Sequence, residues 1–451
     1  EAEKDENIFD ISQGVSILLC VKECGNPKKI KVYYADIWGS REEKYNILSE
    51  TDVQSTEWYE LQPTSPYYLF VPQTTEWIAE YESGWEIANI FQTDSVGIVT
   101  GRDKLTLHWT EEKLRETVTD FISLSVDEAR GKYQLPKDSQ DWKIHLAQAD
   151  LRNHPNVEQH IQSIHYRPFD TRWTYYTGQS SGFHGRPRPE IMRHMRKENF
   201  ALCIHRGIKS PIWQHALVTN QISEKSYISN RGEPTAHVFP LYLYPNSEEL
   251  GLSTERSLNF ESAFLAALSE TLELPQTAPF NLPEGVSPEE ILAYIYAILY
   301  SPKYRKRYYE FLKYDFPRIP LPQDIAQFRT LAALGQRLMD WHLLKDGSRL
   351  QVAPTGRGVP AVHRFEGEGD GIVEKARYLE GRVWINPTQY FTDVSVEVWE
   401  YEIGAYQVCE KWLKDRRGEV LSHTDVRRYR AILVAIAETL AVMGEIDSVL
   451  W

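Results

Sequence analysis

The sequence predicts a mixed α/β (α+β) fold, with a sheet at the N-terminus, a helical connector, an α/β region and a mainly helical C-terminal half. Three observations predict it. β-Branched and aromatic residues are enriched from Ile8 to about Ile37, as is typical of strands. From Thr110 the apolar residues follow helical spacing. After about residue 254 helical patterns dominate the chain.

Each element follows from a local pattern. The polar turn GNPKK separates the first strands, and Thr110 is a suitable N-cap for the first long helix. The expected elements are strands within Ile8–Ile37, helix Arg41–Ser49, strand Tyr67–Val71, a strand and glycine turn within Ser95–Leu105, helices Thr110–Lys132 and Ser139–His160, strands at FALCIHRG and His237–Tyr244, helices Thr254–Thr271, Pro288–Tyr300, Lys303–Tyr314 and Pro322–Leu344, and final helices Ser395–Trp412 and Thr424–Ile446.

Composition limits the class of protein. The 451 residues, 42% of them hydrophobic and 12% aromatic, are enough for about three ordinary domains and exclude a disordered chain. The 50 Lys and Arg against 64 Asp and Glu give a net charge of −14. No overall positive field therefore attracts a polyanion, and any nucleic-acid site must be a local basic region.

Cysteine usage and hydropathy indicate the compartment. Four cysteines are too few for a disulfide framework, so we expect a reducing cytoplasm. The most continuous apolar stretches, Ile291–Tyr300 and Ala431–Met443, are shorter than the roughly 20 residues of a membrane span, and no membrane association is expected. The start EAEKDENIFD has neither an initiator Met nor a signal-peptide pattern. We therefore expect a fragment or a processed chain with sequence missing upstream.

Common catalytic and metal-binding motifs do not predict a site in this chain. The chain has no P-loop, no H-E-x-x-H and no paired C-x-x-C. Acidic residues alternate with the glycines of GEGDG (367–371) and would repel a phosphate, so a surface turn is favoured there. Cys20 and Cys24 lack partners at zinc spacing, and His154, His160 and His165 are too dispersed to predict a shared metal.

The strongest local signal is a basic region over Tyr166–Pro211. Nine cations against three anions give +6 inside a chain of −14, which is the contrast that a phosphate-binding face requires. Arg can also read guanine through two hydrogen bonds. The candidate DNA-binding residues are Arg167, Arg172, Arg186, Arg188, Arg193, Arg196, Arg206 and Lys209.

Alternative roles stay open within this region. Arg167 and Arg172 either contact DNA or pair with Asp170 to fix the turn after Pro168, and in that case they organise the site. Trp173, Tyr175 and Tyr176 either stack on bases or belong to the core. Two further basic stretches, SPKYRKRYYEFLKYDFPRIPLP and KWLKDRRGE with VRRYR, are either solvated helix faces or additional contacts.

Three long phrases resemble a known family. YRPFDTRWTYYTG, ILAYIYAILYSPKYRKRYYEFLKYDFPRIPLP and VWEYEIGAYQVCEKWLKDRRGEVLS occur in the family order. They resemble the C-terminal specificity region of type ISP restriction–modification enzymes and related single-chain adenine methyltransferases. NIFDISQGVSILLCV and GIVTGRDKL resemble the segments that come after the methyltransferase core in that family.

The resemblance implies three parts: a remnant of a methyltransferase domain with a truncated sheet (1–110), a helical connector (111–160) and a target-recognition region (161–451). It also implies recognition of a specific sequence in double-stranded DNA. The family's N-P-P-Y motif, which holds the flipped adenine, is absent, as are its helicase and nuclease motifs. This chain is therefore expected neither to methylate nor to cleave alone, and to hold no cofactor. S-adenosylmethionine is expected to bind the full-length parent.

Two hypotheses about function remain. In the first, the chain recognises DNA for an adenine-specific methyltransferase or restriction enzyme whose catalytic domain or subunit lies upstream. In the second, it is an assembly module that positions a separate catalytic subunit without binding DNA autonomously. The acidic net charge favours the second hypothesis, and the basic region favours the first.

Overall fold

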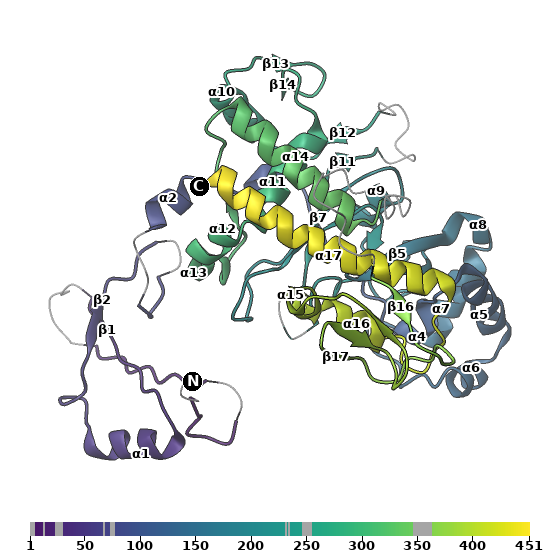
Figure 1. The fold of residues 1–451 in the computed structure, drawn as a ribbon, viewed down its shortest axis with the longest axis horizontal. Helices are drawn as coiled ribbons and strands as arrows, with labels where there is room; N and C mark the ends of the chain where they lie inside the picture. Colours follow the sequence, from purple (N-terminus) through teal and green to yellow (C-terminus); the bar gives the residue numbers. More distant parts are fainter. Residues whose placement is uncertain are drawn as a thin grey trace. The chain divides into compact units, whose positions relative to one another are not determined.

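A computed structural model describes residues 5–11, 14–22, 30–65, 68–72, 77–230, 232, 235–245, 255–345 and 363–451. Its contacts divide the chain into two compact units, Glu1–Ile78 and Ala79–Trp451. The described elements alternate between helices and short strands (Figure 1), which confirms the predicted mixed α/β class. The predicted boundaries at residues 110 and 160 fall inside the second unit, and they stay predictions.

The N-terminal unit contains a short hairpin and one helix. β1 (Val32–Tyr34) pairs antiparallel with β2 (Tyr59–Leu61). α1 (Arg41–Glu50) begins at a capping box in which Ser40 and Glu43 bond each other's backbone N–H groups. Residues 14–22 were expected to form a strand, but they lie outside every described strand. Apolar alternation does not make a strand unless a neighbouring strand takes up the backbone hydrogen bonds.

The second unit opens with small helices. Thr110 caps α5, as expected, but the predicted helix 110–132 divides because Ser125 forms a new capping box. The first elements are α2 (Ile78–Glu82), whose first residue lies in the N-terminal unit, β3 (Trp85–Glu86), α3 (Ile87–Ile90), β4 (Ser95–Val96), α4 (Asp103–Thr106), α5 (Glu111–Ser123), α6 (Val126–Lys132), α7 (Ile144–Asn153) and α8 (Val157–His160). Leu114, Phe121 and Ala147 belong to one apolar cluster that holds α5 and α7 together.

Two small sheets form the centre of this unit. The first has the strand order β6-β5-β9, and the second has the order β4-β10-β7-β8. The strands are β5 (Ile161–Arg167), β6 (Asp170–Tyr175), β7 (Ala201–Ile204), β8 (Ala216–Thr219), β9 (Ile222–Ser223) and β10 (His237–Pro240), with α9 (Pro189–Met195) inserted between β6 and β7. β7 and β8 are buried at every position. The sheet is therefore core, and the connections carry its exposed residues.

A bundle of three long helices packs beside the sheets. α11 (Pro288–Tyr300), α14 (Ile325–His342) and α17 (His423–Leu450) all contact one another. A Cβ at Gly335 would overlap the carbonyl oxygen of Ala293, so this glycine allows α11 and α14 to approach closely. The two ring nitrogens of buried His342 form hydrogen bonds with the hydroxyl groups of Tyr296 (2.6 Å) and Thr439 (3.0 Å). These bonds join the three helices.

The remaining elements of the second unit are short helices and strands. They are β11 (Tyr242–Leu243), β12 (Ser257–Leu258), α10 (Ser262–Thr271), β13 (Gln276–Thr277), β14 (Leu282–Pro283), α12 (Pro302–Arg307), α13 (Tyr309–Leu312), β15 (Arg318–Ile319), β16 (Phe365–Glu366), β17 (Arg377–Leu379), β18 (Arg382–Trp384), β19 (Tyr390–Phe391), α15 (Val396–Glu400), β20 (Glu402–Ile403), β21 (Tyr406–Gln407) and α16 (Val408–Lys414). The predicted helix 395–412 is interrupted by the β20–β21 hairpin, whose turn uses Gly404 at a φ of 58°. No helix among the described residues is long and apolar enough to cross a membrane.

Candidate nucleic-acid interface

The eight predicted cations fall into three groups. Arg167 and Arg172 lie on the β5–β6 hairpin and are buried. Arg186, Arg188, Arg193 and Arg196 lie on α9 and the loop before it, and Arg206 and Lys209 follow β7. Nine residues, including the four of buried β7, separate Arg196 from Arg206 in the chain. The predicted set therefore combines two buried arginines with cations on two separate segments.

Arg167 belongs to a buried ion pair. It is 7% exposed, and its Nη1 donates to the Glu224 carboxylate at 2.6 Å. Its guanidinium also lies over the Tyr166 ring, 3.7 Å from the centroid. Burial raises the pKa of Glu224, and the neighbouring Arg167 opposes that shift. The guanidinium is paired through Nη1 and buried, and its buried Nε has no hydrogen-bond partner among the described residues, so burial keeps it from a phosphate.

Arg172 belongs to a second buried network centred on Asp170. Its Nε and Nη2 both donate to Oδ2 of Asp170, at 3.0 and 2.9 Å. Arg416 of the loop after α16 donates to Oδ1 of the same carboxylate at 3.3 Å. Both guanidiniums lie over the indole of Trp109, with distances of 3.0 and 4.1 Å from the ring centroid. Arg172 thus makes the expected pair with Asp170, whereas Arg167 pairs with Glu224.

A third arginine fixes the turn of the same hairpin. Arg428 of α17 donates from Nε and Nη2 to the carbonyl oxygen of Phe169, at 3.1 and 3.0 Å, and to Thr171 at 3.0 Å. Phe169 has a φ of 60°. Figure 1 shows that the N-terminal part of α17 reaches β5. The sequence offered a signal for this contact, because Arg428 is one helical turn before buried Ile432.

The second group is arranged by α9. Pro189 stands at the first turn, and the preceding Arg188 adopts a left-handed φ of 56°, which normally favours glycine. Its Nε is buried without a described hydrogen-bond partner. Arg186 is exposed and pairs with Asp141 at 2.7 Å, while its backbone bridges to Val99. A carboxylate therefore already neutralises Arg186.

Arg193 on α9 and Arg196 at the C-cap of this helix are both exposed. Ile191, Met192 and Met195 pack into the core, so helical geometry directs positions 193 and 196 together towards solvent. Arg196 donates to the carbonyl oxygen of Gln159 at 2.6 Å and forms no described ion pair. Arg193 is also exposed and forms no ion pair with a described residue. These two guanidiniums keep their full charge for a ligand.

The third group follows β7. Arg206 pairs with Asp315 at 2.8 Å. Lys209 is exposed and has no ion pair with a described residue. Gly207, with a φ of 71°, lets this loop pack against the backbone of Lys313. Lys209 is therefore the more available cation of this pair.

The aromatic residues of the basic region divide as the alternatives allowed. Tyr175 and Tyr176 are buried, and the Tyr176 hydroxyl donates to the carbonyl of Pro187 at 3.0 Å. Trp173 is half-buried and pairs through its backbone with His108. Tyr175 and Tyr176 are core residues in this structure, and Tyr176 anchors the loop that carries Arg186 and Arg188.

The histidines and cysteines form no metal centre in the described part of the chain, where no three ligands come together. Burial lowers the pKa of His165 to about 3, and its Nδ1 bonds Thr219 at 2.8 Å. It is therefore a neutral core residue at pH 7. Cys20 is exposed, and Cys24 lies outside the described residues.

Two short letter patterns associated with enzymes occur, and neither forms a site. Phe365–Gly369 reads F-x-G-x-G, but a Cβ at Gly367 would overlap the carbonyl of Thr388, so this segment packs on its own chain as a turn. Its carboxylates also oppose a phosphate. Gly178–Gly182 reads G-x-S-x-G, but Ser180 is exposed in a turn, and none of the described hydrogen bonds joins it to a histidine.

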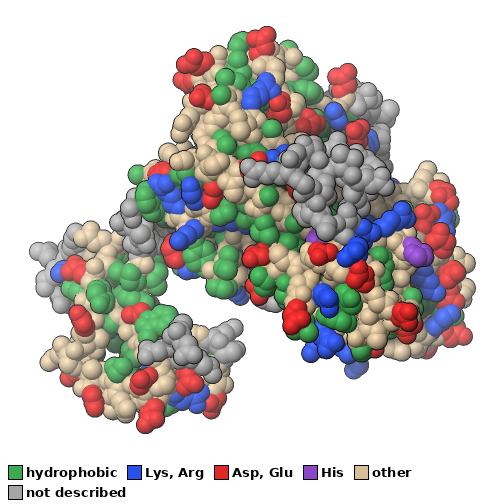
Figure 2. Space-filling model, in the orientation of Figure 1, with side chains coloured by type: hydrophobic (Ala, Val, Ile, Leu, Met, Phe, Trp, Pro, Cys, Tyr) green, Lys and Arg blue, Asp and Glu red, His purple; other side chains and the backbone are tan. Residues whose placement is uncertain are grey.

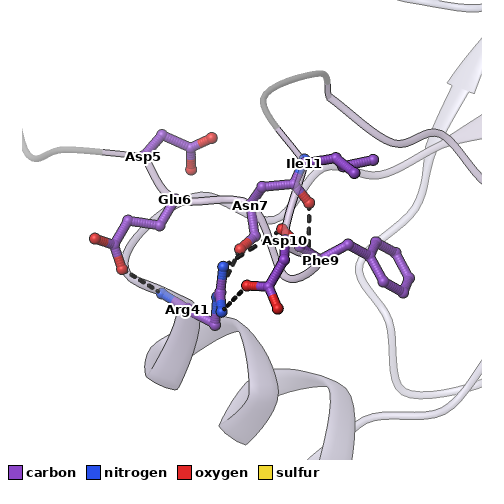
Figure 3. Close-up of a pocket in the computed structure, with 7 residues that line it drawn as sticks. All are labelled: Asp5, Glu6, Asn7, Phe9, Asp10, Ile11 and Arg41. Carbon is purple, nitrogen blue, oxygen red and sulfur yellow. Dashed lines mark hydrogen bonds and ion pairs between the residues drawn. The ribbon is translucent and has the colours of Figure 1, made fainter.

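A pocket in the N-terminal unit has the wrong charge for DNA. Asp5, Glu6 and Asp10 contribute carboxylates to its lining, with Arg41 as the one cation in it (Figure 3). Arg41 pairs with Asp10 at 2.8 Å and also donates to the carbonyl of Asn7 at 2.9 Å. The lining therefore carries a net negative charge that repels phosphates.

Charged side chains of both signs cover the second unit. Figure 2 shows Lys and Arg among Asp and Glu over the visible face, without one continuous basic field. This agrees with the net charge of −14. Binding of a polyanion must therefore depend on a few local, unneutralised cations.

Comparison with known families gives a match over most of the chain. The family described as "Type ISP C-terminal specificity domain" matches residues 89–445. This covers more than half of the chain and includes all eight predicted cations. A search of the curated proteins found no matching relative.

Three solved structures share the fold. A nuclease-deletion mutant of the type ISP restriction–modification enzyme LlaGI, in complex with a DNA substrate mimic, matches with a TM-score of 0.61 and 17% identity over 93% of this chain and 33% of that one. The DrdV–DNA complex gives 0.64 and 19% over 92% and 43%. The ATP-dependent type ISP enzyme LlaBIII bound to DNA gives 0.62 and 14% over 92% and 28%. The chain thus spans less than half the length of each of these proteins.

Proposed function

Because the chain belongs to the type ISP C-terminal specificity domain family, we propose that it recognises a specific sequence in double-stranded DNA. The family match over residues 89–445 carries this proposal. The similar fold of LlaGI, DrdV and LlaBIII, each described in a DNA complex, supports it. The recognition serves an adenine-specific DNA methyltransferase or restriction–modification enzyme.

The exposed arginines of α9 supply the first DNA contact in this proposal. Arg193 and Arg196 share one helix face and have no ion-pair partner among the described residues. Arg186 and Arg188, on the loop before the helix, flank them. The buried Arg167 and Arg172 hold the β5–β6 hairpin through their ion pairs and act as organisers. Phosphate contacts of this kind set the register in which base contacts specify the sequence.

The catalytic chemistry belongs to an upstream domain or subunit in this proposal. The sequence has no N-P-P-Y motif, and the one F-x-G-x-G pattern packs against its own chain. No residue here is therefore assigned to S-adenosylmethionine, and the parent enzyme would hold it elsewhere. Base flipping and methyl transfer need a complete pocket, which the upstream part would provide.

The N-terminal unit supports an upstream partner. Its residues Ile17, Leu18, Leu19 and Val21 are between 67% and 89% exposed. Burial of such side chains contributes roughly 1.5–3 kcal/mol each, so a run of them in solvent favours a covering surface. We propose that this segment packs against the methyltransferase domain. Co-expression with the upstream region should protect residues 14–22 from proteolysis.

Selection from random DNA duplexes at two salt concentrations tests the function. We expect one enriched motif and an affinity that falls as salt rises, because each neutralised phosphate releases counterions. Arg193→Ala with Arg196→Ala should lower the slope of log affinity against log salt by up to about 2. Unselective binding, or affinity that ignores salt, contradicts the proposal.

The matched control is Arg337→Ala. Arg337 already pairs with Glu445 at 2.7 Å, so its loss removes a neutralised charge and should leave both the motif and the slope unchanged. If wild-type chain selects nothing but co-purifies with the upstream catalytic region, the assembly-module hypothesis replaces DNA recognition.

A further inference from the structure

The β17–β18 hairpin carries a second set of arginines outside the predicted basic region. Its two-residue turn, Glu380 and Gly381, has φ values of 48° and 73°, as a tight hairpin turn requires. Leu379 and Arg382 close the turn as a cross-strand pair. In the sheet order β16-β19-β18-β17, this hairpin forms the edge.

The two faces of this sheet differ sharply. Val383 and Phe391 point inwards, are fully buried and belong to the main core. Because side chains alternate along a strand, their neighbours point outwards. The outward residues of the three strands are Arg377, Leu379, Arg382, Trp384 and Tyr390. Leu379 is 52% exposed, so solvent reaches this face.

Aromatic rings hold the two arginines on the outward face. Trp384 and Tyr390 are cross-strand partners with ring centroids 4.4 Å apart. The Arg377 guanidinium lies 5.6 Å from the Trp384 centroid, and that of Arg382 lies 4.8 Å from the Tyr390 centroid. Such contacts restrict a long side chain, which lowers the entropy lost when it binds.

The charges of these arginines are not neutralised. Neither Arg377 nor Arg382 forms an ion pair with a described residue, whereas the nearby Glu366 already pairs with Arg364 at 3.2 Å. Lys375 adds a further exposed cation just before β17. Figure 2 shows Lys and Arg side chains gathered at the lower margin of the region that holds β17.

We propose that Arg377 and Arg382, held by Trp384 and Tyr390, form a second DNA contact, made by the outward face of the β17–β18 hairpin. This inference rests on the proposed function and extends it to a segment that the sequence signal missed. A two-stranded ribbon fits the major groove. The planar guanidinium can donate two parallel hydrogen bonds to a guanine edge or a phosphate.

DNA fits this face better than an apolar protein partner. Two ordered cations without carboxylate partners would be costly to bury in a hydrophobic interface, but they complement phosphates and guanine acceptors. Leu379 at the turn is the one large exposed aliphatic side chain of the outward set. The face is therefore cationic with aromatic supports, and it is not an apolar docking surface.

The test compares three variants of the full chain on the duplex selected by the wild type. Arg377→Ala with Arg382→Ala should weaken binding roughly tenfold or more. The double Lys variant keeps the charge and loses the planar fork, and it should recover the salt dependence without the sequence preference. Arg337→Ala is the matched control and should bind as wild type does.

The outcomes separate the two proposals. If the wild type binds and the double Ala variant binds equally well with the same preferred sequence, the second contact is overturned and the proposed function stands. If the wild type itself selects no DNA, both fail. Thermal melts of each variant show whether a loss of binding comes from unfolding.

The aromatic supports are positioning residues with their own test. Tyr390→Leu removes the ring under Arg382 and should weaken binding about two- to fivefold. Tyr390→Phe keeps the ring and loses the 3.4 Å hydroxyl contact to Glu366, and it should restore affinity. An equal loss in both variants would contradict a role through the ring.

Discussion

Two hairpins of the second unit carry the same residue types and use them in opposite ways. The β5–β6 hairpin and the β17–β18 hairpin both mix arginines with aromatic residues. In the first, Arg167 and Arg172 are buried and paired with carboxylates. In the second, Arg377 and Arg382 are exposed and rest on rings.

The neighbouring elements cause this difference. Arg416 and Arg428, from the loop after α16 and from α17, close over the β5–β6 hairpin and share Asp170 and the Phe169 carbonyl with it. The outward face of β17–β18 has no such cover among the described residues. An arginine is thus structural or available according to the carboxylates around it, and local composition does not distinguish the two cases.

Removal of Asp170, from the buried ion-pair network of the β5–β6 hairpin, should have the largest effect on stability. Asp170 is 2% exposed and accepts hydrogen bonds from two guanidiniums. Asp170→Ala would leave Arg172 and Arg416 buried without their counterion, and we expect the free energy of unfolding to fall by about 3–5 kcal/mol. Urea unfolding followed by tryptophan fluorescence measures it.

The control for that experiment is Asp141→Ala. It breaks the exposed pair with Arg186 and should cost no more than about 1 kcal/mol. Similar losses in both variants would show that the Asp170 network is no more than a surface pair.

Acid should have the next largest effect, because it lowers the stability of the buried region around the β5–β6 hairpin. Burial lowers the pKa values of His165 and His342 to about 3, below the ordinary 6.5 that they regain on unfolding. Above pH 6.5 each histidine is neutral in both the folded and the unfolded state. As pH falls from 6.5 towards 3, only the unfolded state takes up the proton. The free energy of unfolding therefore falls by up to about 1.4 kcal/mol per pH unit for each histidine. Between pH 7 and pH 5 one such histidine costs about 2 kcal/mol.

Unfolding midpoints at pH 7, 6 and 5 check this expectation. His165→Gln should reduce the acid dependence by the share of one histidine, while the share of His342 remains. His145→Gln, on the exposed side of α7, should leave the acid dependence unchanged. β17 and β18 contain no histidine. An acid slope that is as steep in His165→Gln as in the wild type would place its origin outside the β5–β6 hairpin.

Substitution of the exposed arginines of the β17–β18 hairpin should have the smallest effect on stability. Arg377→Ala with Arg382→Ala removes no buried contact, so the free energy of unfolding should stay within about 0.5 kcal/mol per substitution. A stability loss near that of Asp170→Ala would mean that these arginines are structural too. The two hairpins would then not differ in how they use their arginines.

Long helices were the most predictable elements. α11 was expected at Pro288–Tyr300 and occupies those residues, and α17 contains all of the predicted 424–446. Strong apolar periodicity and N-terminal caps determine such helices locally. The division of 395–412 by a hairpin was not predicted, because Gly404 packs against Ile228, far away in the sequence.

The site was predictable in part. The sequence identified the basic region, and its exposed face on α9 follows from helical spacing. It could not sort the arginines, because Glu224, Asp141 and Asp315 lie 57, 45 and 109 positions from the arginines with which they pair. The β17–β18 face was missed for a related reason, since its cations and rings meet only across strands.

The sequence by itself determined the mixed α/β class, the caps and periodicity of the long helices and the family phrases. These are local properties, encoded within a few helical turns. Only the tertiary structure decided which cations keep their charge. Neutralisation depends on which carboxylate the fold brings within about 3 Å of a guanidinium, and that distance is set by packing between segments remote in the chain.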